Sequence, residues 1–121
     1  MRFVIGGSDS HKRRFVENRY GVSEILKADY DTVMTANAVY GFHDFIRKMM
    51  NDNIDINRLI DEMCAKNPDI IVISTEIGYG VVPMDSGDRE WRECVGRSCC
   101  YLAEKAETVV RVVCGIGNVI K

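Results

Sequence analysis

Short apolar runs alternate along the chain with longer segments whose apolar residues recur every three or four positions. The clearest run is 69–75, which reads DIIVIST; such a β-branched run is typical of a strand covered on both faces. Segments 2–5 and 108–114 have a similar composition, and 31–35 is a weaker example. We therefore predict strands at these four places.

Helical periodicity occurs in four segments, which are 11–20, 38–50, 55–66 and 88–107. The first ends at Gly21 and the third at Asn67-Pro68, and both are common helix terminators. A glycine-containing loop, 76–87, precedes the fourth. Strands separated by helices indicate βαβ units, so the prediction is a three-layer α/β fold with a mostly parallel sheet and helices on both faces.

Composition narrows the class of protein. The chain has 121 residues, of which 46% are hydrophobic and 28% charged, so we expect one globular domain spanning 1–121. The net charge of −2 gives no general attraction for nucleic acid. No apolar run is long enough for a membrane span, and the one near the N-terminus is too short for a signal peptide. We therefore expect a cytoplasmic protein.

The cysteines do not predict a metal site or a disulfide framework. There are five of them, an odd number, and they form no C-x-x-C pair. We interpret them as thiols that pack in a reduced compartment.

The first strand leads directly into a glycine-rich turn and a basic helix start. This order is typical of a phosphate loop, in which backbone N–H groups and the helix N-terminus face an anion. Gly6 and Lys12 have the spacing of the pattern G-x-x-x-x-G-K-[ST], but His11 replaces the second glycine and Arg13 the hydroxyl residue. The candidate phosphate- or nucleotide-binding residues are Gly6, Gly7, Ser8, Asp9, Ser10, His11, Lys12 and Arg13.

A second interpretation of this turn needs no ligand. Ser8, Asp9 or Ser10 can cap the helix, and the basic residues 12–14 can extend into solvent. However, cations in a first helical turn oppose the helix dipole, and a bound anion would remove that conflict.

Further candidate residues follow the strongest strand. Glu76 comes at its carboxyl end, where open α/β sheets bind ligands, and is a candidate catalytic residue together with Lys12. Arg89 and Arg92 share one helix face and can reach a phosphate or form ion pairs with neighbouring acids. His43 is interpreted as a surface histidine.

The carboxyl-terminal part resembles the bifunctional adenosylcobinamide kinase / adenosylcobinamide-phosphate guanylyltransferase family of cobalamin biosynthesis. Residues 75–83, TEIGYGVVP, are similar to the family's N-E-V-G-x-G-I-V-P loop. Residues 89–93, REWRE, followed by Gly96, are similar to R-x-F-R-D-x-x-G, and 115–121 to the closing G-x-x-x-x-x-K. The amino terminus is similar to the family's G-G-x-x-S-G-K-S opening.

The resemblance implies a P-loop NTPase fold with a RecA-like parallel sheet. Family members phosphorylate a hydroxyl of adenosylcobinamide and then attach GMP through a guanylylated histidine. The ligands implied are therefore GTP or ATP and a corrinoid, and the implied assembly is a homo-oligomer.

Several family features are absent from this sequence. Arg13 stands where the loop hydroxyl would bind magnesium, and residues 35–40 contain no acid where the family has one at a strand end. The sequence therefore predicts no magnesium site. The segment that carries the guanylyl-accepting histidine is much shorter here, and neither histidine of the chain is in a corresponding place.

Three functions remain open from the sequence. The first is a divergent, shortened family member that binds a nucleotide or phosphate without full bifunctional catalysis. The second is an active adenosylcobinamide kinase-type phosphotransferase. The third is a structural relic with an empty site and a protein partner.

Overall fold

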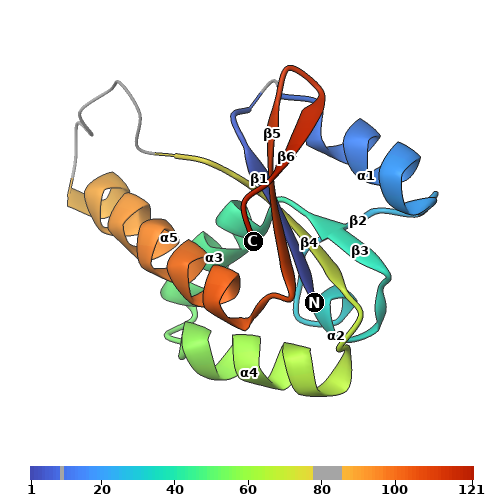
Figure 1. The fold of residues 1–121 in the computed structure, drawn as a ribbon. Helices are drawn as coiled ribbons and strands as arrows, with labels where there is room; N and C mark the ends of the chain where they lie inside the picture. Colours follow the sequence, from blue (N-terminus) through green and yellow to red (C-terminus); the bar gives the residue numbers. More distant parts are fainter. Residues whose placement is uncertain (9, 78–85) are drawn as a thin grey trace.

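A computed structural model of the chain describes residues 1–8, 10–77 and 86–121. Asp9 and most of the glycine-containing loop expected at 76–87 lie outside the described residues. Six strands form one sheet in the order β2-β3-β4-β1-β5-β6, with helices on both faces (Figure 1). All pairings are parallel except that of β5 with β6. This arrangement confirms the predicted three-layer α/β fold.

The bounds of the elements follow the chain. The strands are β1 (Arg2–Gly6), β2 (Leu26–Lys27), β3 (Ala38–Tyr40), β4 (Ile71–Thr75), β5 (Thr108–Val113) and β6 (Ile116–Val119). The helices are α1 (Lys12–Tyr20), α2 (Thr32–Thr35), α3 (Phe42–Asn51), α4 (Ile56–Lys66) and α5 (Ser86–Lys105).

The first strand is central in the sheet. It pairs with β4 on one side and with β5 on the other, so that its last residue, Gly6, is opposite both Thr75 and Val112. Because β3 runs parallel to β4, Tyr40 ends at the same edge. The carboxyl ends of these strands therefore meet beside the turn that follows β1, which is where open α/β sheets bind ligands.

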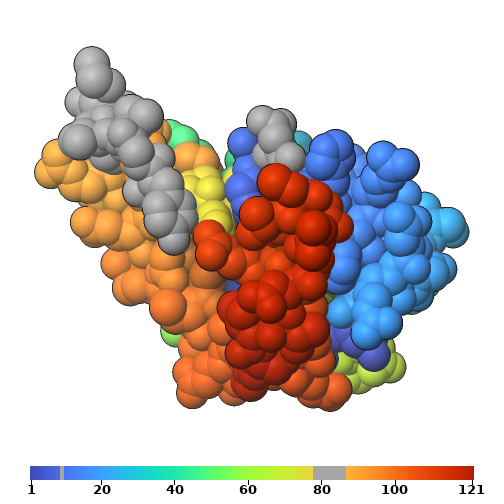
Figure 2. Space-filling view, turned by 45° about the horizontal axis from the view of Figure 1, so that its top comes forward, coloured from blue at the N-terminus to red at the C-terminus, as the bar shows by residue number. Residues whose placement is uncertain are grey.

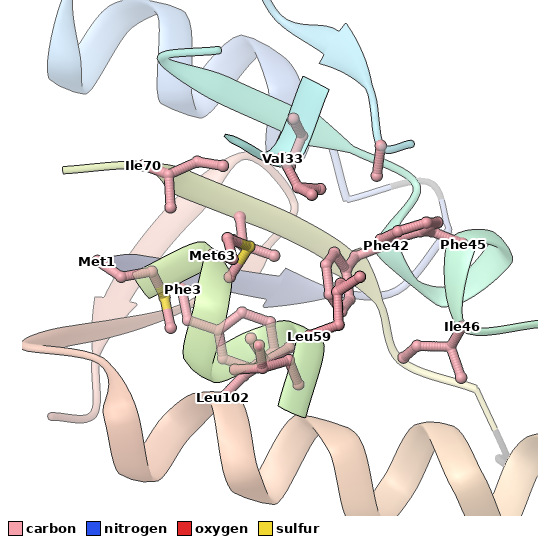
Figure 3. Close-up of a cluster of buried hydrophobic side chains, with 14 of the residues drawn as sticks. Met1, Phe3, Val33, Phe42, Phe45, Ile46, Leu59, Met63, Ile70 and Leu102 are labelled. Atoms are coloured by element: carbon pink, nitrogen blue, oxygen red, sulfur yellow. The ribbon is translucent and has the colours of Figure 1, made fainter. Parts of the chain in front are cut away.

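Each face of the sheet has its own hydrophobic core. Side chains of β1 alternate between them: Phe3 belongs to the larger cluster, under α3, α4 and α5, and Val4 to the smaller one, under α1. Figure 3 shows part of the larger cluster, in which Phe3 lies close to Leu102 of α5. Phe3 is 1% exposed, and burying a side chain of this kind stabilises the fold by about 1.5–3 kcal/mol.

Two of the predicted elements are wrong. The segment 31–35 contains the short helix α2 instead of a strand, and it is not part of the sheet. The strand of this region is β3, which lies inside the segment predicted as a helix, 38–50. The helix begins only at Phe42, after Gly41 has turned the chain with a φ of 70°, a conformation that glycine adopts readily.

The apolar tail after 114 forms the edge strand β6, which the sequence analysis did not predict. Cys114 and Gly115 have φ values of 51° and 77°, as in the two-residue turns of tight hairpins, and Val113 pairs with Ile116 across them. In Figure 2 the β5–β6 hairpin, in red, stands at the surface between α5, in orange, and α1, in blue. No helix within the described part of the chain is long and apolar enough to cross a membrane.

Candidate phosphate loop and adjoining cavities

The turn between β1 and α1 depends on glycine at its first position. A Cβ atom on Gly6 would lie 2.5 Å from the carbonyl oxygen of Val112 and 2.6 Å from Oγ of Ser10. Both distances are too short for a side chain, so the loop can pack against β5 only with glycine there. A Cβ on Gly7 would meet nothing within 4 Å.

The Lys12 ammonium lies underneath this loop. Lys12 is 8% exposed, and its Nζ donates a hydrogen bond to the carbonyl oxygen of Gly7 at 2.6 Å, with Oγ of Ser10 at 3.4 Å. Lys12 is also the first residue of α1, so the positive end of the helix dipole and a buried ammonium coincide. Together they make this place attractive to an anion.

His11 adopts the left-handed conformation that favours glycine. Its φ and ψ are 63° and 39°, and it is the N-cap of α1 with no side-chain cap hydrogen bond. Neither Ser8 nor Ser10 is therefore the N-cap residue. With His11 in place of a glycine, this conformation costs about 1–2 kcal/mol, the usual penalty for a side chain in this region.

A cavity of about 580 Å³ opens between α1 and the carboxyl ends of β3 and β4. Its cationic lining is Lys12, Arg13, Arg14 and Lys27, whereas Glu17 and Asp44 supply carboxylates. The Arg13 guanidinium lies 4.2 Å from the centroid of the Tyr40 ring, a cation–π distance that holds the charge at the cavity wall.

His43 lines the same cavity, so its interpretation as a surface histidine is wrong. The imidazole is 18% exposed, and its Nδ1 accepts a hydrogen bond of 3.3 Å from the backbone N–H of Thr75. The backbone carbonyl of His43 accepts from Nε1 of Trp91 at 2.8 Å, which ties the start of α3 to α5. Burial lowers the pKa of His43; the Asp44 carboxylate opposes this shift and the Lys12 ammonium adds to it.

Asp44 brings a carboxylate to the place where β3 ends. Its Oδ2 lies 4.0 Å from the position that a Cβ on Gly41 would occupy, and 3.7 Å from Nε2 of His43. Residues 35–40 contain no acid, but the structure brings the Asp44 carboxylate, from the first turn of α3, to the end of β3.

The described residues at this site form no ready-made group of metal ligands. Arg13 has only donors where the loop pattern has a hydroxyl, and the carboxylates that line the cavity are those of Glu17 and Asp44. Over the described residues, no three His, Cys, Asp or Glu side chains come close enough together to hold a metal ion.

Glu76 follows β4 and is hydrogen-bonded to residues of β1 and β5. Its backbone N–H donates to the carbonyl oxygen of Gly6 at 2.8 Å. Its carboxylate accepts from Arg111 of β5, with Nε at 3.0 Å and Nη2 at 3.3 Å. Arg89 and Arg92 lie on α5 and do not line either cavity beside the loop.

A second cavity, of about 480 Å³, lies between α1 and the turn of the β5–β6 hairpin. Its lining is His11, Arg14, Phe15, Asn18, Arg19, Cys114 and Gly115, so His11 and Arg14 border both cavities. The backbone N–H of Gly115 donates to the carbonyl oxygen of Ser10 at 2.9 Å and joins the hairpin turn to the loop.

Sequence reasoning did not place His43 or Asp44 at this site, nor the residues of the second cavity other than His11. His43 and Asp44 reach the loop only because α3 packs beside β4, and nothing local in the sequence indicates that placement. A usable signal was Gly41, since a glycine between Tyr40 and Phe42 marks the end of a strand.

A central parallel first strand, followed by a glycine turn that encloses a lysine and opens a helix, defines the P-loop class of α/β proteins. Comparison with models of protein families identifies the family within this class. The chain belongs to the cobinamide kinase / cobinamide phosphate guanyltransferase family, whose model matches residues 14–120. The match begins directly after the candidate loop 6–13. A search among curated proteins finds no match.

Proposed function

We propose that this chain binds a nucleotide, GTP or ATP, with its phosphates on the loop 6–13, and that it lacks the full bifunctional catalysis of its family. The observation that carries the proposal is the buried Lys12 ammonium at the N-terminus of α1, enclosed by a turn that requires glycine at position 6. Cationic residues that line the cavity beside the loop, Arg13, Arg14 and Lys27, add to the attraction for an anion.

The proposal includes binding without magnesium. Arg13 occupies the position of the hydroxyl ligand, and its guanidinium is directed to the cavity wall over Tyr40. Its permanent charge can neutralise part of a polyphosphate's charge in place of a bound cation. The Glu76 carboxylate is paired with Arg111, so we do not assign it to nucleotide binding. Glu76 remains a candidate for a chemical step.

Calorimetric titration with ATP and GTP, with and without magnesium, tests this proposal. We expect micromolar binding that does not depend on magnesium and that falls by about 10-fold or more in Lys12→Ala, because a charge-assisted contact is lost. Lys66→Ala, on α4 and paired with Glu62, is the matched control and should bind like the wild type. Absence of binding to the wild type would refute the proposal.

A second candidate function is a kinase that transfers phosphate to a hydroxyl of cobinamide, the substrate in the family's name. The observation that favours it is the Asp44 carboxylate in the 580 Å³ cavity, which can accept a proton from such a hydroxyl. Magnesium-dependent transfer from ATP or GTP to cobinamide, abolished in Asp44→Asn, would support it. Nucleotide binding with no transfer would support the first proposal instead.

A further inference from the structure

The two edges of the sheet differ in how they are protected. An edge strand exposes main-chain N–H and C=O groups that can pair with another chain, and proteins usually block them with charged residues, proline or very short strands. The edge strand β2 is two residues long, and one of them is Lys27. The edge strand β6 is four residues long, and the segment 113–120 around it, VCGIGNVI, contains no charged residue and no proline. β6 is therefore the open edge of the described sheet.

Apolar side chains concentrate at this open edge. The large hydrophobic residues that are exposed, among those the structure describes, are Ile54 and four residues of the hairpin and its end: Val113, Ile116, Val119 and Ile120. In Figure 2 the hairpin, in red, lies at the surface of the molecule. Apolar groups gathered along an unpaired edge strand mark a surface that pairs with another chain.

The hydrogen bonds of the hairpin determine which residues of β6 face outward. The N–H of Ile120 donates to the carbonyl oxygen of Val109 at 2.9 Å, so the main chain of Ile120 faces β5. In an antiparallel pair this direction alternates from one residue to the next. The main-chain groups of Gly117 and Val119 therefore face away from β5, toward the open edge.

These outward groups match a second copy of the same strand. A two-fold axis through Asn118, perpendicular to the sheet, places Gly117 of each copy opposite Val119 of the other. Both residues have outward main-chain groups, so each such pair can exchange two N–H···O hydrogen bonds. In this register the donors and acceptors of the strand are complementary to themselves.

The side chains of β6 agree with the same register. Because successive residues of a strand point to opposite faces, Ile116, Asn118 and Ile120 lie on one face of the sheet. The axis brings Ile116 of one copy opposite Ile120 of the other, and it brings the two Asn118 amides together, where they can hydrogen-bond. On the other face Val119 comes opposite Gly117, which has no side chain to obstruct it. The exposed apolar groups are thus covered, and no like charges meet.

From these observations we infer that the protein forms a symmetric dimer, in which β6 pairs antiparallel with β6 of a second copy and the six-stranded sheet continues across the interface. The occupant of the edge is a second copy because one two-fold axis satisfies both the main-chain groups and the apolar side chains of the strand. The inference is independent of the proposed function, since it uses no residue of the loop 6–13.

Sedimentation velocity over a series of protein concentrations tests the inference. We expect the wild type to be a dimer at micromolar concentration. Ile116 is 72% exposed, so Ile116→Lys should fold normally. It should raise the dissociation constant of the dimer at least about 10-fold, because two ammonium groups would be enclosed among apolar side chains. Ile54→Lys, at an exposed isoleucine between α3 and α4, is the matched control and should dimerise like the wild type.

A mixture of two variants tests the register. Ile120→Glu should also weaken the dimer on its own. Mixed with Ile116→Lys, it brings a carboxylate opposite the introduced ammonium, while the second contact across the axis stays between two isoleucines. We therefore expect the mixture to dimerise at least about fivefold more tightly than either variant alone.

The possible outcomes are distinct. A wild type that stays monomeric, or that forms an assembly other than a dimer, would overturn the inference. A dimer that Ile116→Lys leaves intact would overturn it as well, and so would a mixture with no gain in affinity. Circular dichroism of each variant establishes that it is folded.

Discussion

The ammonium of Lys12 and the carbonyl oxygen of Gly7 lie 2.6 Å apart, so the loop closes on its own lysine. An anion that binds there competes with a neutral carbonyl for the ammonium. A phosphate oxygen is the stronger partner because its hydrogen bond to an ammonium is assisted by charge on both sides. The closed loop is therefore ready to exchange an internal contact for a ligand.

The two loop glycines give a direct comparison. Gly6→Ala would place its Cβ 2.5 Å from a backbone oxygen of β5, so we expect a loss of stability of about 1–3 kcal/mol and at least about 10-fold weaker nucleotide binding. Gly7→Ala has open space at its Cβ and should stay within about 0.5 kcal/mol of the wild type. Urea unfolding and calorimetry measure both effects. Equal behaviour of the two variants would contradict the loop packing described above.

The conformation of His11 predicts a stabilising substitution. His11→Gly removes a side chain from the left-handed region, which stabilises the folded protein, but glycine is also more flexible in the unfolded chain, which offsets part of this gain. We expect the free energy of unfolding to rise by about 0.5–1 kcal/mol in total. His11→Ala keeps the unfavourable conformation and serves as the control for loss of the imidazole. A glycine variant no more stable than the alanine variant would argue against the strained loop.

Cys114 provides a chemical probe of the second cavity. Cys114 and Cys100 are both exposed, whereas burial raises the pKa of the Cys99 thiol to about 11 and makes it unreactive at pH 8. With an alkylating reagent, we expect GTP or ATP to slow modification of Cys114 at least about fivefold and to leave Cys100 unaffected, because Cys114 lies in the hairpin turn that is joined to the candidate loop, whereas Cys100 lies on α5. Peptide mass spectrometry follows each site. Equal rates of Cys114 modification with and without nucleotide would count against a ligand on the loop.

Stability should depend on pH through His43. Its pKa in the folded protein is below 6.5, its ordinary value, chiefly because of burial. The unfolded chain therefore binds more protons, and the free energy of unfolding should fall as the pH drops below about 6.5 until the folded imidazole also titrates. Urea unfolding between pH 7.5 and 5 should show this slope in the wild type and a flatter one in His43→Gln. Parallel slopes would assign the effect to other groups.

The sequence predicted the elements whose signal is local. The run at 69–75 contains β4 because continuous β-branched residues suit a strand covered on both faces. The strand β3 was missed because its three residues also fit the helical periodicity that continues into α3. Only the pairing of Ala38 and Val39 with β4 shows that these residues form a strand and not the start of the helix. That pairing is a contact between segments distant in the sequence.

The same difference between local signals and contacts of distant segments applies to the candidate site. The candidate loop could be located from the sequence because its residues are contiguous: the spacing of Gly6 and Lys12 and the resemblance to the family's opening both lie in one short segment. The cavity residues come from separate elements: His43 from α3, Asn18 from α1 and Cys114 from the hairpin turn. Their positions depend on the order of strands in the sheet, which no local pattern specifies.

The hydrogen bond between Gly115 and Ser10 also bears on how this protein is made. The two residues that fix the loop against the hairpin are separated by nearly the whole sequence. At about 5–20 residues per second, a ribosome needs about 5–20 s after Ser10 to add Gly115, and more until the hairpin leaves the exit tunnel. The loop residues are synthesised early, but the hairpin turn that holds them exists only once residue 115 has been added, so a ligand that needs the joined loop can bind only after that point.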